Sequence, residues 1–292
     1  MDGADRALSA EQEAHVRALI CEKRPEQLKL EFALWTCGAG KQLIERECAI
    51  ALKVRAVGNY LKRWGLTPQK PIKRAYKQRP EAVKAWLDET HPAIEKQARA
   101  EGGEIHWGDE TALVNTDAAI PKGRSYAPRG QTPVTMAVGG TRQKLSMIST
   151  VANQGKSSWM MIDESFNADR LIEFLTALVT DAQSRKNADG SSAPKKGFLI
   201  LDNLRVHHGK LVKAWLADKT KTIKVFYLPS FSPQLNPDER LNADLKYAIG
   251  GRVPARTKIK LEAAATQHMQ MLQVNSERVK SYSGDPRCAY AA

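Results

Sequence analysis

Apolar positions along the chain follow two different periods, and these predict the elements. Phe198–Leu201 is a short, wholly apolar run behind a glycine, which is typical of a strand buried on both faces. Asn167–Asp181 places apolar side chains at i, i+3, i+4 and i+7, the spacing of a helix with one buried face. Similar patterns predict further strands at 105–110, 134–138, 144–151, 159–163 and 222–228, and further helices at 210–218 and from about 236 onward.

This order of elements predicts the fold class and the division into domains. Several strands followed by alternating helices and strands indicate an α/β domain, a mixed sheet with helices on its faces, over residues 104–292. Helical patterns at 8–22, 32–46 and 54–64, with a turn near 49–53, are typical of a helix-turn-helix unit. We therefore expect a helix-turn-helix domain with a basic arm at 1–78, a connecting helix at 79–103 and the α/β domain thereafter.

Composition narrows the class of partner. The formal net charge of +13 implies an acidic partner, for which DNA, RNA and an anionic membrane are the candidates. No run approaches the roughly 18 apolar residues of a spanning helix, and the first residues lack the apolar core of a signal peptide. The four cysteines form no CxxC pair, which favours reduced thiols. We expect a cytoplasmic protein of bacterial type with no membrane partner.

Basic residues cluster beside the helix-turn-helix pattern. Between Lys53 and Lys84 there are ten lysines and arginines and a single acid, Glu81. The stretch 66–74 is basic and interrupted by prolines, so it resembles a wing or an extended arm over a phosphate backbone. A basic run alone is usually a solvated face, but next to a helix-turn-helix it favours DNA contact. The DNA-binding candidates here are Arg55, Lys62, Arg63, Lys70, Lys73 and Arg74.

Three carboxylates indicate metal-dependent chemistry. Asp109 and Asp202 are expected at the ends of strands, and Glu239 in the first turn of a helix. One such acid alone is usually structural, but three of them in a basic chain with a helix-turn-helix favour phosphodiester chemistry. Carboxylate oxygens are suited to Mg²⁺ or Mn²⁺, and two ions roughly 3.5–4 Å apart can activate the attacking oxygen and stabilise the leaving one.

The neighbours of these acids are candidates for supporting roles. Adjacent strand residues point to opposite faces, so we expect Asp109 to face the cleft and Glu110 to point away. Asn203 is expected to support the loop after Asp202. The histidines that follow could contact a phosphate, could support the metal ligands from behind, or could belong to an ordinary surface loop. An arginine in the turn-rich loop is expected to hold DNA or pair with an acid. These candidates are His207, His208 and Arg129.

Four blocks of sequence carry a family resemblance. They are Gly108-Asp109-Glu110, residues 127–133 (APRGQTP), Leu201-Asp202-Asn203 followed by two histidines, and residues 228–239 (LPSFSPQLNPDE). Together they resemble the DDE transposases of the mariner-related bacterial insertion-sequence 630 family, from about Ser9 to the C-terminus. Between the second and third acids lie 36 residues (239 − 202 − 1), close to that family's spacing.

The resemblance implies a fold, a reaction and partners. The α/β domain would be RNase H-like, with Asp109, Asp202 and Glu239 as the catalytic ligands of two Mg²⁺ or Mn²⁺ ions. The reaction would be hydrolysis at transposon ends, followed by attack of the freed 3′-hydroxyl on target DNA. The partner would be double-stranded DNA, namely terminal inverted repeats and target, bound by a homodimer associated with the bacterial nucleoid.

One departure from the family keeps two alternatives open. Family members usually carry a further helix-turn-helix domain ahead of the portion that begins at Ser9, and this chain starts without it. The chain can therefore also be read as a truncated DNA-binding regulator without catalytic activity. The second alternative is an inhibitor that pairs with a full-length transposase.

Overall fold

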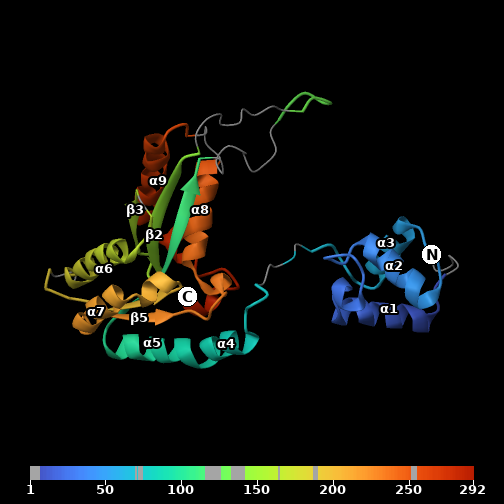
Figure 1. Ribbon diagram of the computed structural model, residues 1–292, viewed down its shortest axis with the longest axis horizontal. Coiled ribbons are helices and arrows are strands. Elements are labelled where there is room, and N and C mark those ends of the chain that lie inside the picture. The colour runs from blue at the N-terminus through green and yellow to red at the C-terminus, as the bar shows by residue number, and fades with distance from the viewer. Residues whose placement is uncertain are drawn as a thin grey trace. The chain divides into compact units, whose positions relative to one another are not determined.

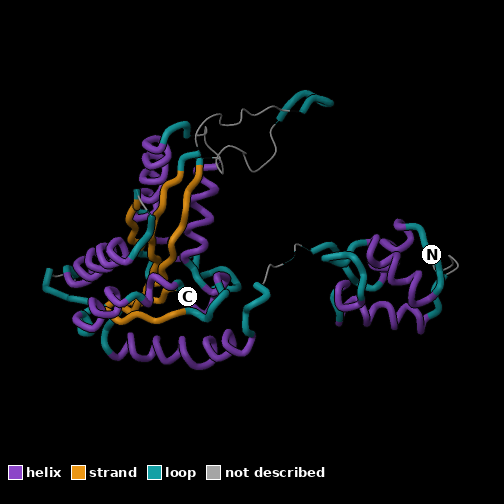
Figure 2. Tube along the Cα trace, in the orientation of Figure 1, coloured by secondary structure: helices purple, strands orange, loops and turns teal. Residues whose placement is uncertain are grey.

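The chain divides into two compact units, Met1–Lys73 and Arg74–Ala292. The computed structural model describes residues 7–69, 71, 75–115, 126–132, 142–163, 165–186, 190–250 and 255–292. Figure 1 shows the elements in chain order, and Figure 2 shows that the strands lie in the second unit. The strand predicted at 134–138 and the candidates Lys70, Lys73 and Arg74 lie outside the described residues.

The first unit is a small helical domain. It contains α1 (Ala10–Glu22), α2 (Cys37–Cys48) and α3 (Val54–Arg63), with a 3-10 turn at Pro25–Leu28, and its described residues include no strand. The three helices enclose one apolar core that contains Val16, Leu43, Ile44, Val57 and Trp64. A Cβ at Gly40 of α2 would lie 3.0 Å from Val57 of α3, so glycine permits the close approach of these two helices.

Capping side chains determine where these helices begin. The Ser9 hydroxyl accepts a hydrogen bond from the Gln12 amide at 3.2 Å, and the Gln12 side chain accepts one from the Ser9 amide at 2.9 Å. This capping box makes Ser9 the N-cap of α1. The prediction that the second helix begins at residue 32 is wrong. The Thr36 hydroxyl accepts a hydrogen bond from the Ala39 amide at 3.1 Å, so Thr36 is the N-cap and α2 begins at Cys37.

The second unit is built on a five-stranded mixed sheet. Its strands lie in the order β3-β2-β1-β4-β5, and β2 pairs antiparallel with β1 on one side and with β3 on the other. β4 and β5 run parallel to β1, which confirms the mixed sheet predicted from the order of elements. The strands are β1 (Glu104–Val114), β2 (Lys144–Ala152), β3 (Ser157–Ile162), β4 (Gly197–Leu201) and β5 (Ile223–Tyr227).

Helices cover both faces of this sheet (Figure 1). They are α4 (Pro80–Ala85), α5 (His91–Ala100), α6 (Ala168–Gln183), α7 (Lys210–Asp218), α8 (Asp238–Gly250), α9 (Lys258–Gln273) and α10 (Ser276–Lys280). On one face α5, α8 and α9 bury Trp107 of β1 together with their own apolar side chains. On the other face α6 and α7 bury Phe174, Leu199 and Val212. Every helix in the described part of the chain is too short or too polar to span a lipid bilayer.

The segment predicted as one helix at 80–100 is interrupted by a π-helical turn. This turn, Trp86–Thr90, joins α4 to α5. Pro92 follows it and has no N–H to donate to the carbonyl of Asp88, so the regular α-helical ladder is broken there. Trp86, the first residue of this turn, and Ile94 of α5 share the core of the second unit with Trp107.

Candidate active site

The register of two parallel strands brings the first two predicted acids together. Trp107 of β1 lies opposite Ile200 of β4, and Asp109 and Asp202 each follow two residues further along. Asp202 is the first residue after β4, where open α/β sheets place their ligands. The prediction that the first strand ends at its carboxylates is wrong, because pairing with β2 extends β1 to Val114.

Close packing requires the glycine before the first acid. A Cβ at Gly108 would lie 2.9 Å from Leu201 Cδ2 and 3.1 Å from the carbonyl oxygen of Ser149. The Gly108 carbonyl also accepts a hydrogen bond from Asn236 Nδ2 at 2.9 Å. This bond fixes the segment before α8 against β1, next to Asp109.

Glu239 reaches the same place from the first turn of α8. The Asn236 side chain accepts a hydrogen bond from the Asp238 amide at 3.1 Å, which sets the start of the helix. Asp109, Asp202 and Glu239 all line one pocket of about 340 Å³. Three carboxylates that are far apart in the sequence therefore meet where β4 ends beside the middle of β1.

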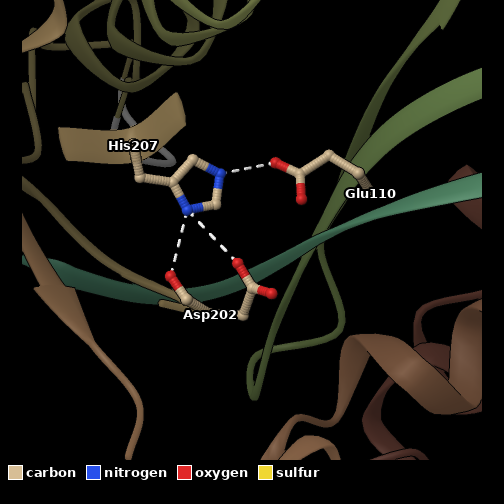
Figure 3. A group of neighbouring side chains, drawn as sticks. All are labelled: Glu110, Asp202 and His207. Atoms are coloured by element: carbon tan, nitrogen blue, oxygen red, sulfur yellow. Dashed lines mark hydrogen bonds and ion pairs between the residues drawn. The ribbon is translucent and has the colours of Figure 1, made fainter. Parts of the chain in front are cut away.

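The two adjacent acids of β1 point to opposite faces of the sheet. Asp109 Oδ2 accepts a hydrogen bond from Asn242 Nδ2 of α8 at 3.0 Å. Glu110 Oε1 lies 2.7 Å from His207 Nε2, on the 3-10 turn Arg205–His208 that follows β4 (Figure 3). Strand alternation thus separates the acid that lines the pocket from the acid that holds a histidine.

His207 connects Glu110 to Asp202 (Figure 3). Its Nδ1 lies 3.0 Å from the Asp202 carbonyl oxygen and 3.3 Å from Asp202 Oδ1. A carbonyl oxygen only accepts, so Nδ1 carries a proton. Burial disfavours the charged ring, but the hydrogen bonds to Asp202 and Glu110 outweigh it and raise the pKa of His207 to about 10. The ring is therefore an imidazolium that donates to both acids.

Two groups of residues near this point offer metal ligands. Glu110, Asp202 and His207 each have a ligand atom within 4.8 Å of the other two. An imidazolium has no lone pair for a metal, however, so His207 in this state cannot ligate. The better ligand set is the three carboxylates that line the pocket, since hard oxygen donors are what Mg²⁺ and Mn²⁺ prefer.

The electrostatics of the pocket fit a bound cation. Burial, followed by repulsion from Glu239, Glu110 and Asp202, raises the pKa of Asp109 to about 8. Burial also raises the pKa of Glu239, to which Asp202 adds, while Lys246 and Arg240 partly compensate. The carboxylates thus crowd negative charge into a partly buried pocket, and a divalent cation would offset that repulsion.

Sequence analysis missed two polar residues behind the pocket. Asp238 is fully buried and accepts a hydrogen bond from Ser149 Oγ at 2.7 Å. Burial first, and repulsion from Asp109 second, raise the pKa of Asp238 well above its usual range. Asn242 donates to Asp109 and lies within 3.4 Å of Asp238. Asn242 lies three residues after Glu239 and four after Asp238, so the three share one face of α8, but this spacing alone does not indicate a role.

Asn203 and His208 tie together the loops beside the pocket. Asn203 Nδ2 donates to Ser230 Oγ at 3.0 Å, and Asn203 Oδ1 lies 2.6 Å from His208 Nε2. The His208 ring also packs on Tyr227, with 4.2 Å between ring centroids. The loop after β4 is thus joined to the loop after β5.

The basic candidates in the described residues differ in what they contact. Arg55 and Lys62 are exposed on α3, and Arg129 is exposed in the 126–132 segment. Arg63 instead lies over the Tyr60 ring, 4.9 Å from its centroid, and 3.6 Å from a carboxylate oxygen of Glu13.

Two protein families match different parts of the chain. Residues 104–262 match the family described as DDE superfamily endonuclease, which is more than half of the chain. The chain belongs to the DDE superfamily endonucleases. Residues 31–90 of this endonuclease-family chain match the family described as winged helix-turn helix. No match to a curated protein was found.

Solved structures share the fold at low sequence identity. The Mos1 transposase paired-end complex with left transposon end is 18% identical, with a TM-score of 0.59 over 97% of this chain and 82% of that chain. The Mos1 mariner paired end complexes with Mn and with Mg are 16% and 19% identical, with TM-scores of 0.59 and 0.58. Both alignments cover 100% of this chain; they cover 82% of the Mos1 chain in the complex with Mn and 83% of it in the complex with Mg. This likeness confirms the predicted RNase H-like fold preceded by a helix-turn-helix domain.

Proposed function

We propose that this chain is a DDE transposase of the insertion-sequence 630 type, which cleaves DNA at transposon ends and joins the freed ends to target DNA. One observation carries the proposal: Asp109, Asp202 and Glu239, from three different elements, line a single pocket. The net charge of +13 and the winged helix-turn-helix match support DNA as the partner. Similarity to Mos1 transposase complexes supports the same reaction class.

In this proposal the three carboxylates hold two Mg²⁺ or Mn²⁺ ions. Bound ions of this kind supply activation of the attacking oxygen and stabilisation of the leaving oxygen. The neighbouring side chains prepare the ligands: Asn242 holds one oxygen of Asp109, and His207 holds Asp202. The solved Mos1 complexes that contain Mn and Mg support this choice of ion.

DNA would be held by the basic residues of both units. Arg55 and Lys62 on α3, together with Arg129, are exposed and would contact phosphates, and Lys70, Lys73 and Arg74 would extend that contact. Arg63 would mainly stabilise α3 and not contact DNA itself, since it already contacts Glu13.

Two transposon ends must be joined in one reaction, so we propose a homodimer that acts on cytoplasmic, nucleoid-associated DNA, as the paired-end Mos1 complexes suggest.

A cleavage assay tests this proposal. The substrates are labelled duplexes with the sequences that flank the gene on each side, incubated with Mg²⁺, Mn²⁺ or EDTA. We expect metal-dependent nicking that falls by about a thousandfold in the Glu239→Gln variant, because a metal ligand contributes several kcal/mol to the transition state. DNA binding should remain. Undiminished nicking by that variant would refute the assignment, whereas binding without nicking by the wild type would favour the truncated regulator.

A further inference from the structure

Phe231 is strained and exposed at the same time. It follows β5, in the loop that leads to the 3-10 turn Pro233–Leu235, and has φ +60°. This left-handed conformation costs conformational energy in a residue that carries a Cβ. The side chain is nevertheless 51% exposed, so packing against the protein's own core does not offset that cost. Such strain in a rigid setting is characteristic of residues that contact a ligand.

The surrounding loop is held on both sides of this residue. Gln78 Nε2 donates to the Phe231 carbonyl oxygen at 2.9 Å and lies 3.1 Å from Ser232 Oγ. Asn203 Nδ2 donates to Ser230 Oγ at 3.0 Å on the other side. The backbone is therefore fixed by its neighbours, and the aromatic ring is left accessible.

The position of the ring connects it to the carboxylates. Phe231 lines the same pocket as Asp109, Asp202 and Glu239. A second exposed apolar side chain, Leu204, lines this pocket from the loop that follows Asp202. Two exposed apolar side chains thus flank the three carboxylates, which are suited to hold the cations that neutralise a phosphodiester.

A paired duplex offers little to an apolar ring beside its phosphates, because its accessible surface there is sugar and phosphate. An unstacked base presents a flat apolar face, and aromatic side chains bind such faces with little regard to sequence. We propose that Phe231 is a stacking surface for an unpaired nucleobase next to the phosphate that enters the carboxylate pocket. The inference rests on the proposed function, which places that phosphate at the three acids.

The test compares two DNA probes of the same sequence, one fully paired and one with a frayed end, each with 2-aminopurine at the terminal position. Binding is measured by anisotropy in Ca²⁺, which takes the same type of oxygen ligand. The wild-type protein should prefer the frayed probe and quench its 2-aminopurine. Phe231→Ala should lose about tenfold in affinity for the frayed probe and leave the paired probe unchanged.

Further variants separate the ring from the strain. Phe231→Tyr and Phe231→Trp should keep the preference, while Phe231→Gly, which relieves the positive φ, should lose it. Leu211→Ala is the matched control, because Leu211 is 60% exposed on α7 and does not line the pocket. Equal binding of both probes by the wild type, or an unchanged preference in Phe231→Ala, would overturn the inference alone. Failure of the wild type to bind either probe would overturn the proposed function as well.

Discussion

His207 shows how one buried side chain can orient the candidate metal ligands. Its side chain is 1% exposed and donates in two directions, to Asp202 and to Glu110. The bond to the Asp202 backbone carbonyl fixes the ring, and the ring in turn holds the Asp202 carboxylate. His207 is therefore a positioning residue in this account, not a ligand.

Replacing His207 by alanine should affect both stability and metal binding. The change removes the His207 donor from two partly buried acids, Glu110 and Asp202, so we expect the free energy of unfolding to fall by about 1–3 kcal/mol. Mn²⁺ affinity should fall with it, because Asp202 loses the group that orients it. Urea unfolding with and without Mn²⁺ measures both effects.

Glu110→Gln is the matched comparison for this substitution. The glutamine carbonyl still accepts from His207 Nε2, so the ring stays in place and Mn²⁺ affinity should stay close to that of the wild type. If His207→Ala binds Mn²⁺ as tightly as the wild type does, the positioning role is wrong.

The sequence predicts the three pocket acids but not the groups behind them. Asp109, Asp202 and Glu239 are marked by local signals, namely the strands and the helix start beside them. Asp238 and Asn242 have no such mark, because their roles depend on how α8 packs against β1 and β2. Tertiary contacts of this kind are not encoded in any local pattern.

At the scale of elements, an ionic cluster supports the start of β1. Glu104 pairs with Lys156, and its Oε2 lies 3.6 Å from His106 Nε2 and 3.8 Å from Arg185. Burial opposes ionisation of this carboxyl, but the His106 and Lys156 partners outweigh burial and lower the pKa of Glu104 to about 2. The cluster lies at the opposite end of β4 from Asp202, since Glu104 pairs with Gly197.

Glu104→Gln should therefore destabilise the second unit in a pH-dependent way. The folded pKa of about 2 lies below the ordinary value of 4.5, so the contribution is complete above about pH 4.5 and is lost as pH falls through 2. At neutral pH the loss should be about 3 kcal/mol. Urea unfolding of both proteins at several pH values checks this, and a difference that persists unchanged in acid would contradict it.

The exposed basic residues of α3 are expected to contribute to DNA binding. Arg55→Ala and Lys62→Ala should each weaken DNA binding and reduce the salt slope by about one, as the loss of one phosphate contact requires. Arg63→Ala should instead lower the stability of the first unit, because Arg63 contacts Tyr60 and Glu13. Binding isotherms across salt concentrations measure the slopes.

Arg17→Ala supplies the control for these α3 variants. Arg17 is exposed on α1, outside α3, and its loss should leave the salt slope unchanged. An unchanged slope in both α3 variants would remove α3 from the DNA interface.

Element prediction succeeded where one local signal dominates. The helix predicted at 210–218 matches α7 residue for residue, because its apolar residues follow helical spacing and Gly209 marks where it begins. The helix predicted from 32 failed because the Thr36 cap outweighs the apolar residues before it. α9 was not identified, since two of its five buried positions are Ala265 and His268, which a search for large apolar residues passes over.

At the scale of the molecule, a net positive charge on the chain is combined with a local cluster of acids in the pocket. The chain as a whole is strongly basic, which favours binding to DNA through counterion release. The pocket beside the middle of β1 and the carboxyl end of β4 concentrates acids instead, and burial raises the pKa of Asp109 there to about 8. A basic protein with a local acidic centre is suited to bringing cations to a phosphodiester.

The most direct test of this account is calorimetric titration of Mn²⁺ into the whole chain, since it requires no knowledge of the DNA sequence bound. The wild type should bind Mn²⁺, and Glu239→Gln should weaken that binding at least about tenfold. Asp218→Asn, an exposed acid on α7, is the control and should bind as the wild type does. Equal Mn²⁺ affinity in the wild type and Glu239→Gln would contradict the claim that these three carboxylates form a metal centre.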